Sequence, residues 1–166
     1  MNKVAPGKIL VSQDGRSYII RLVGDVRVTL CASLNNYMEV IFKSEKISEI
    51  IVDMVDTEGV DSTTLGLLAK LAIYSNENFK IRPIVFCPDE SLYETLMVMG
   101  LDDVFKIVQR LRSRLEDYEE LSVEDPSTVA DRTRQQVLDA HRLLSSFNEK
   151  NKYEFLDLIQ ALEEGR

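Results

Sequence analysis

Residues 53–66 read Asp-Met-Val-Asp-Thr-Glu-Gly-Val-Asp-Ser-Thr-Thr-Leu-Gly and connect the strongest strand signal of the chain to a helix. The β-branched run at residues 50–52 is typical of a buried strand. Beyond the polar turn, apolar residues recur at helical spacing, namely Leu65, Leu67, Leu68, Leu71 and Ala72. Asp61 or Ser62 therefore occupies the N-cap position of this helix, and we expect the function of the chain to lie at this turn.

The rest of residues 1–110 alternates strand and helix patterns around this turn. Two strand-like runs, residues 8–13 and 17–24, flank an Asp14-Gly15 pair that indicates a β-hairpin. Next comes a helix with one apolar stripe, which Thr29 is placed to cap. The remaining predicted elements are strands over residues 49–54, 81–87 and 104–108 and a helix over residues 88–100. This order predicts an α/β fold with a mixed sheet of about four to five strands.

The composition narrows the classes of partner. The chain of 166 residues is 45% hydrophobic, which is enough for one domain with a real core and an appendage. Its net charge of -8 opposes nucleic-acid binding, so we expect protein partners. No apolar run reaches the roughly 20 residues of a membrane span, and we expect a cytoplasmic protein without membrane insertion. Cys31 and Cys87 lie in apolar segments without metal-ligand spacing and are predicted to be buried thiols.

The quoted turn resembles the phosphorylation segment of STAS domains, the family of bacterial anti-sigma factor antagonists. In that family, a strand that ends in Asp is followed after eight residues by Asp-Ser-Ser-Gly-Leu-Gly. The residues of this chain that match are Asp53, the pair Asp61-Ser62, and the pair Leu65-Gly66. Thr64 departs from the pattern, since the family usually has Gly there. The order of elements in residues 1–110 also follows the STAS order, so the resemblance implies a STAS domain over that range.

A second local match lies in the loop after the second strand. Gly24-Asp25-Val26-Arg27 stands where the family typically has Gly-Glu-Leu-Asp, whose last residue lies near the phosphorylated serine. Two interpretations of Arg27 remain open. It is either an ordinary exposed arginine, or it lies near Ser62 and would pair with a phosphate through charged hydrogen bonds.

The last third of the chain is predicted to lie outside the sheet. Residues 111–126 are dense in charge and indicate a charged linker or a solvated helix. Residues 127–166 carry two apolar stripes at helical spacing, which predicts a helical extension. This helical pair either packs on the domain or on itself, or it serves as a docking arm or a homodimer seam. His141 lies in the first stripe, and we interpret it as structural because no second ligand lies beside it.

The sequence shows no sign of catalysis. The turn lacks the Gly-rich loop and Lys of a nucleotide cradle, and Asp56, Glu58 and Asp61 would repel a polyphosphate. The sequence contains no recognisable Ser-His-Asp catalytic set, and a lone His141 in the helical extension is a poor base for Ser62. We therefore expect a protein that is not an enzyme and that needs no cofactor or metal.

The resemblance to STAS domains implies an anti-sigma factor antagonist that is switched by phosphorylation. Unphosphorylated Ser62, with Thr63 or Thr64 as the fallback site, would permit capture of an anti-sigma factor or serine kinase. Phosphorylation would release that partner, and a serine phosphatase would restore the antagonist. The expected partner-binding residues are Asp25, Arg27, Asp56, Asp61, Ser62, Thr63, Thr64, Leu65 and Gly66. The alternative is a STAS-like module without a switch, in a lipid-transport or signalling assembly, in which Ser62 is only a helix cap.

Overall fold

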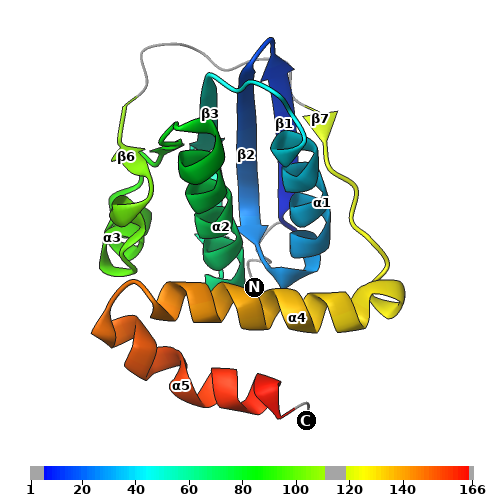
Figure 1. Cartoon of the computed structure of the whole chain (residues 1–166), viewed down its shortest axis with the longest axis vertical. Helices are drawn as coiled ribbons and strands as arrows, with labels where there is room; N and C mark the ends of the chain where they lie inside the picture. Colours follow the sequence, from blue (N-terminus) through cyan, green and yellow to red (C-terminus); the bar gives the residue numbers. More distant parts are fainter. Residues whose placement is uncertain (1–5, 111–118, 165–166) are drawn as a thin grey trace, which may run out of the picture.

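The computed structural model describes residues 6–110 and 119–164, with only the backbone of residues 126–129. Within this part of the chain, seven strands form one sheet (Figure 1). They are β1 (Lys8–Asp14), β2 (Ser17–Val26), β3 (Glu49–Asp53), β4 (Thr57–Val60), β5 (Ile84–Phe86), β6 (Lys106–Val108) and β7 (Glu119–Glu120). Their order is β6-β5-β3-β2-β1-β7, and β4 pairs with the end of β2.

The sheet is mixed, as the sequence predicts. β1 and β2 form an antiparallel hairpin whose turn contains Gly15 at φ 59°, a left-handed conformation that glycine adopts without strain. β2, β3, β5 and β6 are parallel to one another. One row of paired residues crosses these strands from Val11 through Ile20 and Val52 to Val85, and all four side chains are buried. This row lies in the core of the domain.

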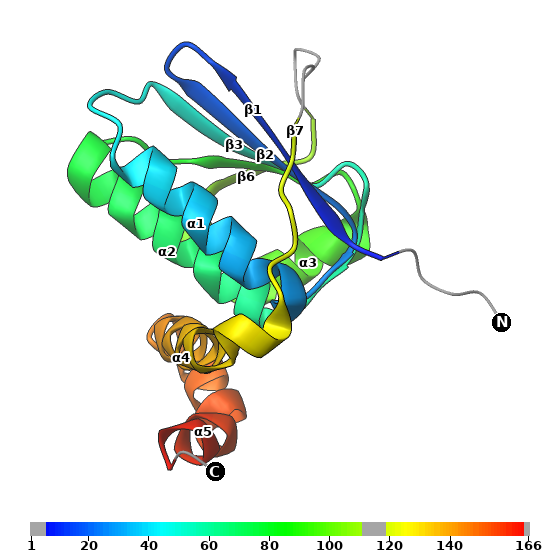
Figure 2. The same ribbon diagram turned by 90° about the vertical axis from the view of Figure 1, so that its right-hand side faces the viewer.

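Five helices accompany the sheet in the described residues: α1 (Cys31–Phe42), α2 (Ser62–Phe79), α3 (Glu90–Val98), α4 (Pro126–Ser145) and α5 (Glu149–Glu163). α1 and α2 lie side by side on one face of the sheet (Figure 2). Gly100 follows α3 in the left-handed conformation at φ 86°, which is the helix-ending role that glycine commonly fills. Each of these helices corresponds to an apolar stripe in the sequence.

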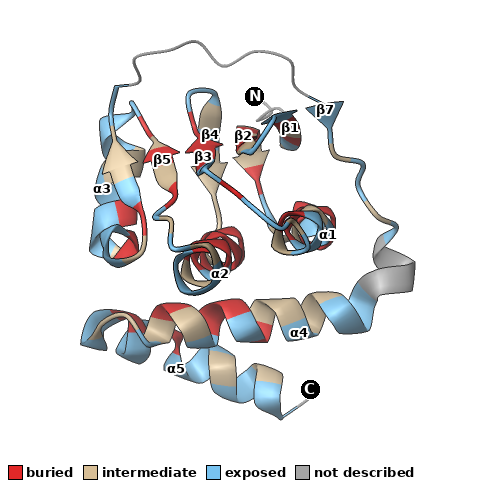
Figure 3. Ribbon diagram, turned by 45° about the horizontal axis from the view of Figure 1, so that its top comes forward, coloured by how far each residue is buried: buried red, intermediate tan, exposed pale blue. Residues whose placement is uncertain are grey.

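The predicted C-terminal helical pair is present, and it packs on the domain. α4 runs across one end of the α/β layers, against the beginning of α2 and beside α1 (Figure 1). α5 turns back beneath α4, and the residues of α4 that face α2 are buried (Figure 3). Asn151 of α5 joins both parts, since its Nδ2 donates to the carbonyl oxygens of Leu144 at 2.9 Å and Met99 at 2.8 Å. In this structure α4 packs on the helices of its own domain, and α4 and α5 also pack on each other.

The structure differs from the sequence expectations in three places. The sheet has two short strands more than the four to five expected: β4, inside the polar turn, and β7, in the charged segment. Residues 111–118 of that segment lie outside the described residues. The prediction that Thr29 caps the first helix is wrong. A 3-10 turn over Val28–Leu30 precedes α1, and neither this turn nor α1 has a side-chain cap at its first residue.

Candidate functional site

Asp61 organises the start of α2. It is the N-cap residue, and its Oδ1 accepts from the backbone N–H of Thr64 at 2.9 Å and from the Thr64 hydroxyl at 2.7 Å. Its Oδ2 accepts from the backbone N–H of Val28 at 2.8 Å. One carboxylate thus satisfies helix-end donors of α2 and a donor of the turn before α1. Of the two N-cap candidates in the sequence, Asp61 fills the position and Ser62 is the first helical residue.

The Ser62 hydroxyl contacts the C-terminal extension. Ser62 Oγ lies 2.7 Å from Nε2 of His141 on α4, and the His141 side chain is only 2% exposed. His141 Nδ1 lies 2.6 Å from the carbonyl oxygen of Val137, which can only accept a hydrogen bond. In the neutral imidazole, Nδ1 therefore carries the proton and Nε2 accepts from the Ser62 hydroxyl. The sequence interprets His141 as structural, and the structure shows a buried, hydrogen-bonded ring whose contact with Ser62 the sequence did not predict.

Gly66 lies one turn further along the same side of α2 and permits the helices to approach closely. A Cβ on Gly66 would lie 2.5 Å from both the Cβ and the carbonyl oxygen of Ala140 and 2.6 Å from its Cα. Carbon atoms in favourable contact are about 3.5–4.0 Å apart, so α4 occupies the space that any side chain at this position would need. The Leu-Gly pair of the sequence motif thus meets the chain's own α4.

The other hydroxyls of the segment are less accessible than Ser62. Thr63 is 5% exposed and Thr64 is fully buried, with its hydroxyl on Asp61. Leu65 is a core residue. Ser62 is the half-buried member of the three, in the first turn of α2 beside α4.

The loop at the end of β2 places an ion pair beside this site. Arg27 Nε donates to Oδ2 of Asp25 at 2.6 Å, and the Arg27 side chain is 61% exposed. The Asp25 carboxylate raises the pKa of the Arg27 guanidinium, and Asp61 adds a smaller effect of the same sign. Asp25, Arg27 and Asp61 therefore share one electrostatic environment at the start of α2. In this structure the charge partner of Arg27 is Asp25.

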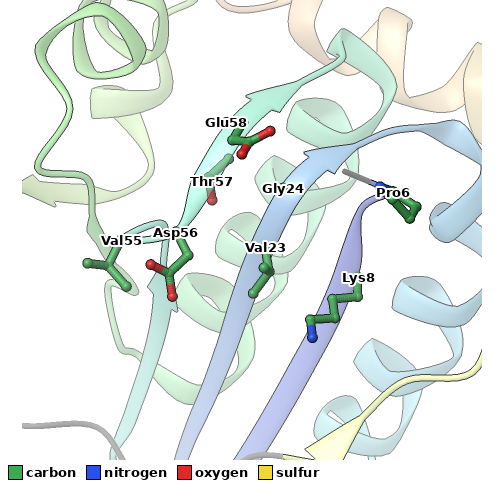
Figure 4. Close-up of a pocket in the computed structure, with 8 residues that line it drawn as sticks. All are labelled: Pro6, Lys8, Val23, Gly24, Val55, Asp56, Thr57 and Glu58. Atoms are coloured by element: carbon green, nitrogen blue, oxygen red, sulfur yellow. The ribbon is translucent and has the colours of Figure 1, made fainter. Parts of the chain in front are cut away.

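Asp53 and Asp56 are linked to each other through Arg21. Asp53 is 1% exposed and accepts from Arg21 Nε at 2.8 Å, while Arg21 also reaches the exposed Asp56 at 3.7 Å. Asp56 lines a pocket with residues of β1, β2 and the β3–β4 segment, among them Lys8 and Glu58 (Figure 4). Of the residues predicted to bind a partner, Asp56 is thus the one that the fold assigns to this pocket.

Two further observations bear on chemistry at the site. The described residues hold no group of three or more His, Cys, Asp or Glu side chains arranged for a metal ion.

Both cysteines are buried, as the sequence predicts. Burial raises the pKa of Cys31 from 9.0 to about 12, partly opposed by its hydrogen bond with Thr64. Burial likewise raises the pKa of Cys87 to about 11. Both thiols are therefore protonated and poorly nucleophilic at neutral pH.

Sequence reasoning missed two members of the site, His141 and Ala140. Both lie on the apolar stripe of the first C-terminal helix, so their burial could be inferred from the helical spacing. Their position opposite Ser62 and Gly66 could not be inferred, because no local pattern reports which helix a stripe faces.

None of the helices in the described residues is long and apolar enough to cross a membrane.

Comparison with solved structures identifies similar folds. An anti-sigma factor antagonist from Mycobacterium paratuberculosis aligns with a TM-score of 0.52 and 15% identity, over 64% of this chain and 88% of that chain. The anti-sigma factor antagonist SpoIIAA in its unphosphorylated form aligns with a TM-score of 0.52 and 13% identity, over 76% of this chain and 97% of that chain. The Bacillus cell fate determinant SpoIIAA in its phosphorylated form gives a TM-score of 0.51 and 16% identity, over 61% of this chain and 92% of that chain.

Comparison of the sequence with curated proteins gives no match. The sequence profile of the STAS domain matches residues 8–116, which is well over half of the chain and includes the whole segment from Asp53 to Gly66. α4 and α5 lie beyond the matched residues. From its profile match and its fold, this chain belongs to the STAS domain family.

Proposed function

We propose that this protein is an anti-sigma factor antagonist whose binding to protein partners is switched by phosphorylation of Ser62. The unphosphorylated form captures an anti-sigma factor or serine kinase, and the phosphorylated form releases it. The kinase transfers the terminal phosphoryl group of a nucleoside triphosphate to Ser62 Oγ, which loses its proton. A serine phosphatase returns the hydroxyl by hydrolysis and releases inorganic phosphate. The protein itself is a binding regulator and performs no catalytic step.

The position of Ser62 is the observation that carries this proposal. Ser62 is the first residue of α2 and is half-buried, whereas Thr63 and Thr64 are buried. Asp61 fills the cap position, so the hydroxyl of Ser62 is not needed to cap the helix. The segment also matches the STAS phosphorylation pattern, and SpoIIAA, a protein of similar fold, has been solved in both phosphorylated and unphosphorylated forms.

Electrostatics explains why a phosphate at Ser62 would act on the partner more than on the fold. Phosphorylation adds about -1.5 to -2 charges at neutral pH, and a helix N-terminus supplies roughly +0.5. The start of α2 can keep such a group in solvent once α4 no longer covers Ser62. A partner that covers a neutral hydroxyl would bury this charge beside Asp61, at a cost of several kcal/mol, or about a thousandfold in affinity.

The test uses the protein as bait in host lysate, with bound proteins and phosphorylated sites identified by mass spectrometry. The baits are the wild type, Ser62→Ala, Ser62→Asp and the matched control Ser91→Asp, which adds the same charge in the first turn of α3 at an exposed position. We expect a kinase-like or anti-sigma partner to bind all but Ser62→Asp. Equal capture by all four would contradict the switch and favour a STAS module of a lipid-transport or signalling assembly without one.

A further inference from the structure

The start of α2 is already occupied by a helix of the same chain. We define the α2 face as Ser62 and Gly66, and the arm as α4 with α5. His141 meets Ser62 at 2.7 Å, and Ala140 fills the space above Gly66. The arm has a second point of attachment at the end of α3, where Asn151 Nδ2 donates to the Met99 carbonyl at 2.8 Å. A protein partner that binds the α2 face therefore has to displace α4.

We propose that the arm is an intramolecular competitor for the partner surface, docked only while Ser62 is neutral and released when Ser62 carries a phosphate. This inference rests on the proposed function for the identity of the surface. The STAS profile ends at residue 116, so the arm is an addition to the domain that the family shares. While Ser62 is neutral, the arm and a protein partner compete for the α2 face, and a phosphate on Ser62 displaces either of them.

The contact at Ser62 makes docking of the arm and phosphorylation mutually exclusive. His141 Nε2 accepts a hydrogen bond from the Ser62 hydroxyl, and a phosphoryl group on Oγ replaces the proton of that hydroxyl. A gap of 2.7 Å between Oγ and Nε2 has no room for a phosphorus atom and its three further oxygens. The added negative charge would also lie next to the Asp61 carboxylate in a half-buried contact. The docked arm shields Ser62 from a kinase for the same steric reason.

The contact at Gly66 defines the kind of partner that can compete. α4 lies close to α2 because Gly66 has no side chain and the opposing residue is Ala140. A partner helix that replaced α4 at the same distance would need a small residue opposite Gly66 and a hydrogen-bond acceptor for Ser62.

The arm is held on the domain by a few polar contacts and by apolar packing, since buried residues of α4 and α5 belong to the core. The ion pair Arg142–Glu163 at 2.8 Å lies within the arm and is exposed, so it holds α5 to α4 and adds nothing to docking on the domain. In the described residues, the polar contacts of α4 and α5 with α2 and the end of α3 are the bonds of His141 to Ser62 and of Asn151 to Met99, and Arg132 of α4 also pairs with Glu124 at 3.0 Å. Loss of the first bond leaves the second as a tether, and release of α4 then also requires separation of its apolar packing on α2.

The test measures the position of the arm in the full-length chain, without a partner. Spin labels are attached to Lys46→Cys in the domain and Lys152→Cys on α5, both exposed positions, and their separation is measured by double electron–electron resonance. The native thiols are buried and react slowly, and a chain without the two introduced cysteines checks this. We expect one narrow distance distribution for the unmodified protein and a broad one when phosphoserine is incorporated at position 62.

A matched pair of substitutions tests the docking contact itself. Ala140→Leu places extra atoms against Gly66, whereas Ala130→Leu makes the same change at an exposed position of α4. We expect a broad distribution for Ala140→Leu only. A narrow distribution for both Ala140→Leu and phosphoserine 62 would overturn the proposal. Circular dichroism of each variant establishes that the domain and the helices are still folded.

The competition is then measured with the purified protein that the Ser62-dependent pull-down retains. A binding site open for about a tenth of the time weakens apparent affinity about tenfold. We expect Ala140→Leu to bind at least about tenfold more tightly than Ala130→Leu. Equal binding by both, with the arm shown to be open in Ala140→Leu, would refute competition. If no protein distinguishes the wild type from Ser62→Asp, the proposed function fails, and the spin-label distances still decide whether charge at Ser62 releases the arm.

Discussion

Replacement of Gly66 by alanine is the sharpest test of how the arm is held. In an isolated helix, this change is favourable by about 1 kcal/mol, because alanine has the higher helix propensity. In this protein the new Cβ would lie 2.5 Å from the Ala140 carbonyl oxygen and 2.6 Å from its Cα. α4 must therefore retreat by roughly 1 Å to restore ordinary contact distances. The higher helix propensity of alanine therefore stabilises α2, whereas the clash of the new Cβ with Ala140 destabilises the packing of α4.

The retreat has a calculable effect on the neighbouring contact. The 2.7 Å separation of Ser62 Oγ and His141 Nε2 would grow to about 3.7 Å, beyond hydrogen-bond range. A buried acceptor without its donor is destabilised by about 1–3 kcal/mol, and overpacking at the glycine adds about 1–3 kcal/mol. If the arm stayed docked, Gly66→Ala would be destabilising by roughly 1–5 kcal/mol. Undocking of the arm relieves the clash and so limits this loss of stability. We therefore expect Gly66→Ala to leave the arm undocked and the free energy of unfolding of the domain nearly unchanged.

Urea denaturation and the spin-label distance measure these two quantities. We expect a broad label distribution and a first transition of the arm that precedes unfolding of the domain. Adding Ala140→Gly removes the Cβ at 2.5 Å, but the backbone atoms of residue 140 still crowd the new methyl group, so rescue should be partial. A Gly66→Ala protein that is more stable than the wild type by the helix-propensity gain and keeps a narrow distribution would refute the reasoning.

The contacts of the domain lead to three more expected outcomes. Arg21→Ala removes the ion pair of the buried Asp53 and should lower the free energy of unfolding by about 3–5 kcal/mol in urea denaturation, with partial recovery in Arg21→Lys. Asp61→Ala removes the hydrogen-bond acceptor of α2 and of the turn before α1, so the free energy of unfolding should fall by more than in Asp89→Ala, which removes a cap from α3 alone and should cost roughly 1 kcal/mol. Equal losses in the two variants would argue against the double role of Asp61. The pKa of Cys31 is raised by burial from 9.0 to about 12, so its contribution to stability is complete below pH 9 and is lost as the pH rises toward 12. Its thiol should react with Ellman's reagent at about pH 8 only after urea is added, and rapid reaction of the native protein would contradict the buried, protonated state.

The elements that the sequence determined are those encoded by local patterns. The Asp14-Gly15 pair marks the hairpin that the structure contains, and the β-branched run before Asp53 is β3. The leucine spacing after Asp61 is α2, and Gly100 ends the region of α3. Helical periodicity, strand alternation and turn chemistry act over a few residues, so they can be read directly from the chain.

The partners of these elements were decided only by the tertiary structure. β4 forms because the segment after Asp53 lies beside the end of β2, and β7 forms because Glu119 and Glu120 reach β1. Asp61 accepts from Val28, 33 residues away, through the packing of α1 beside α2. Such pairings depend on how elements dock, which a local pattern does not specify.

The contact between Ser62 and His141 is the main example of this division. The sequence identified Ser62 by its place in a motif, and it identified His141 as the single histidine on an apolar stripe. It did not join them across 79 residues, because the stripe of α4 would fit many apolar surfaces equally well. The choice is made where Gly66 leaves room for Ala140, since close packing of two helix backbones at that point brings His141 within hydrogen-bond distance of Ser62.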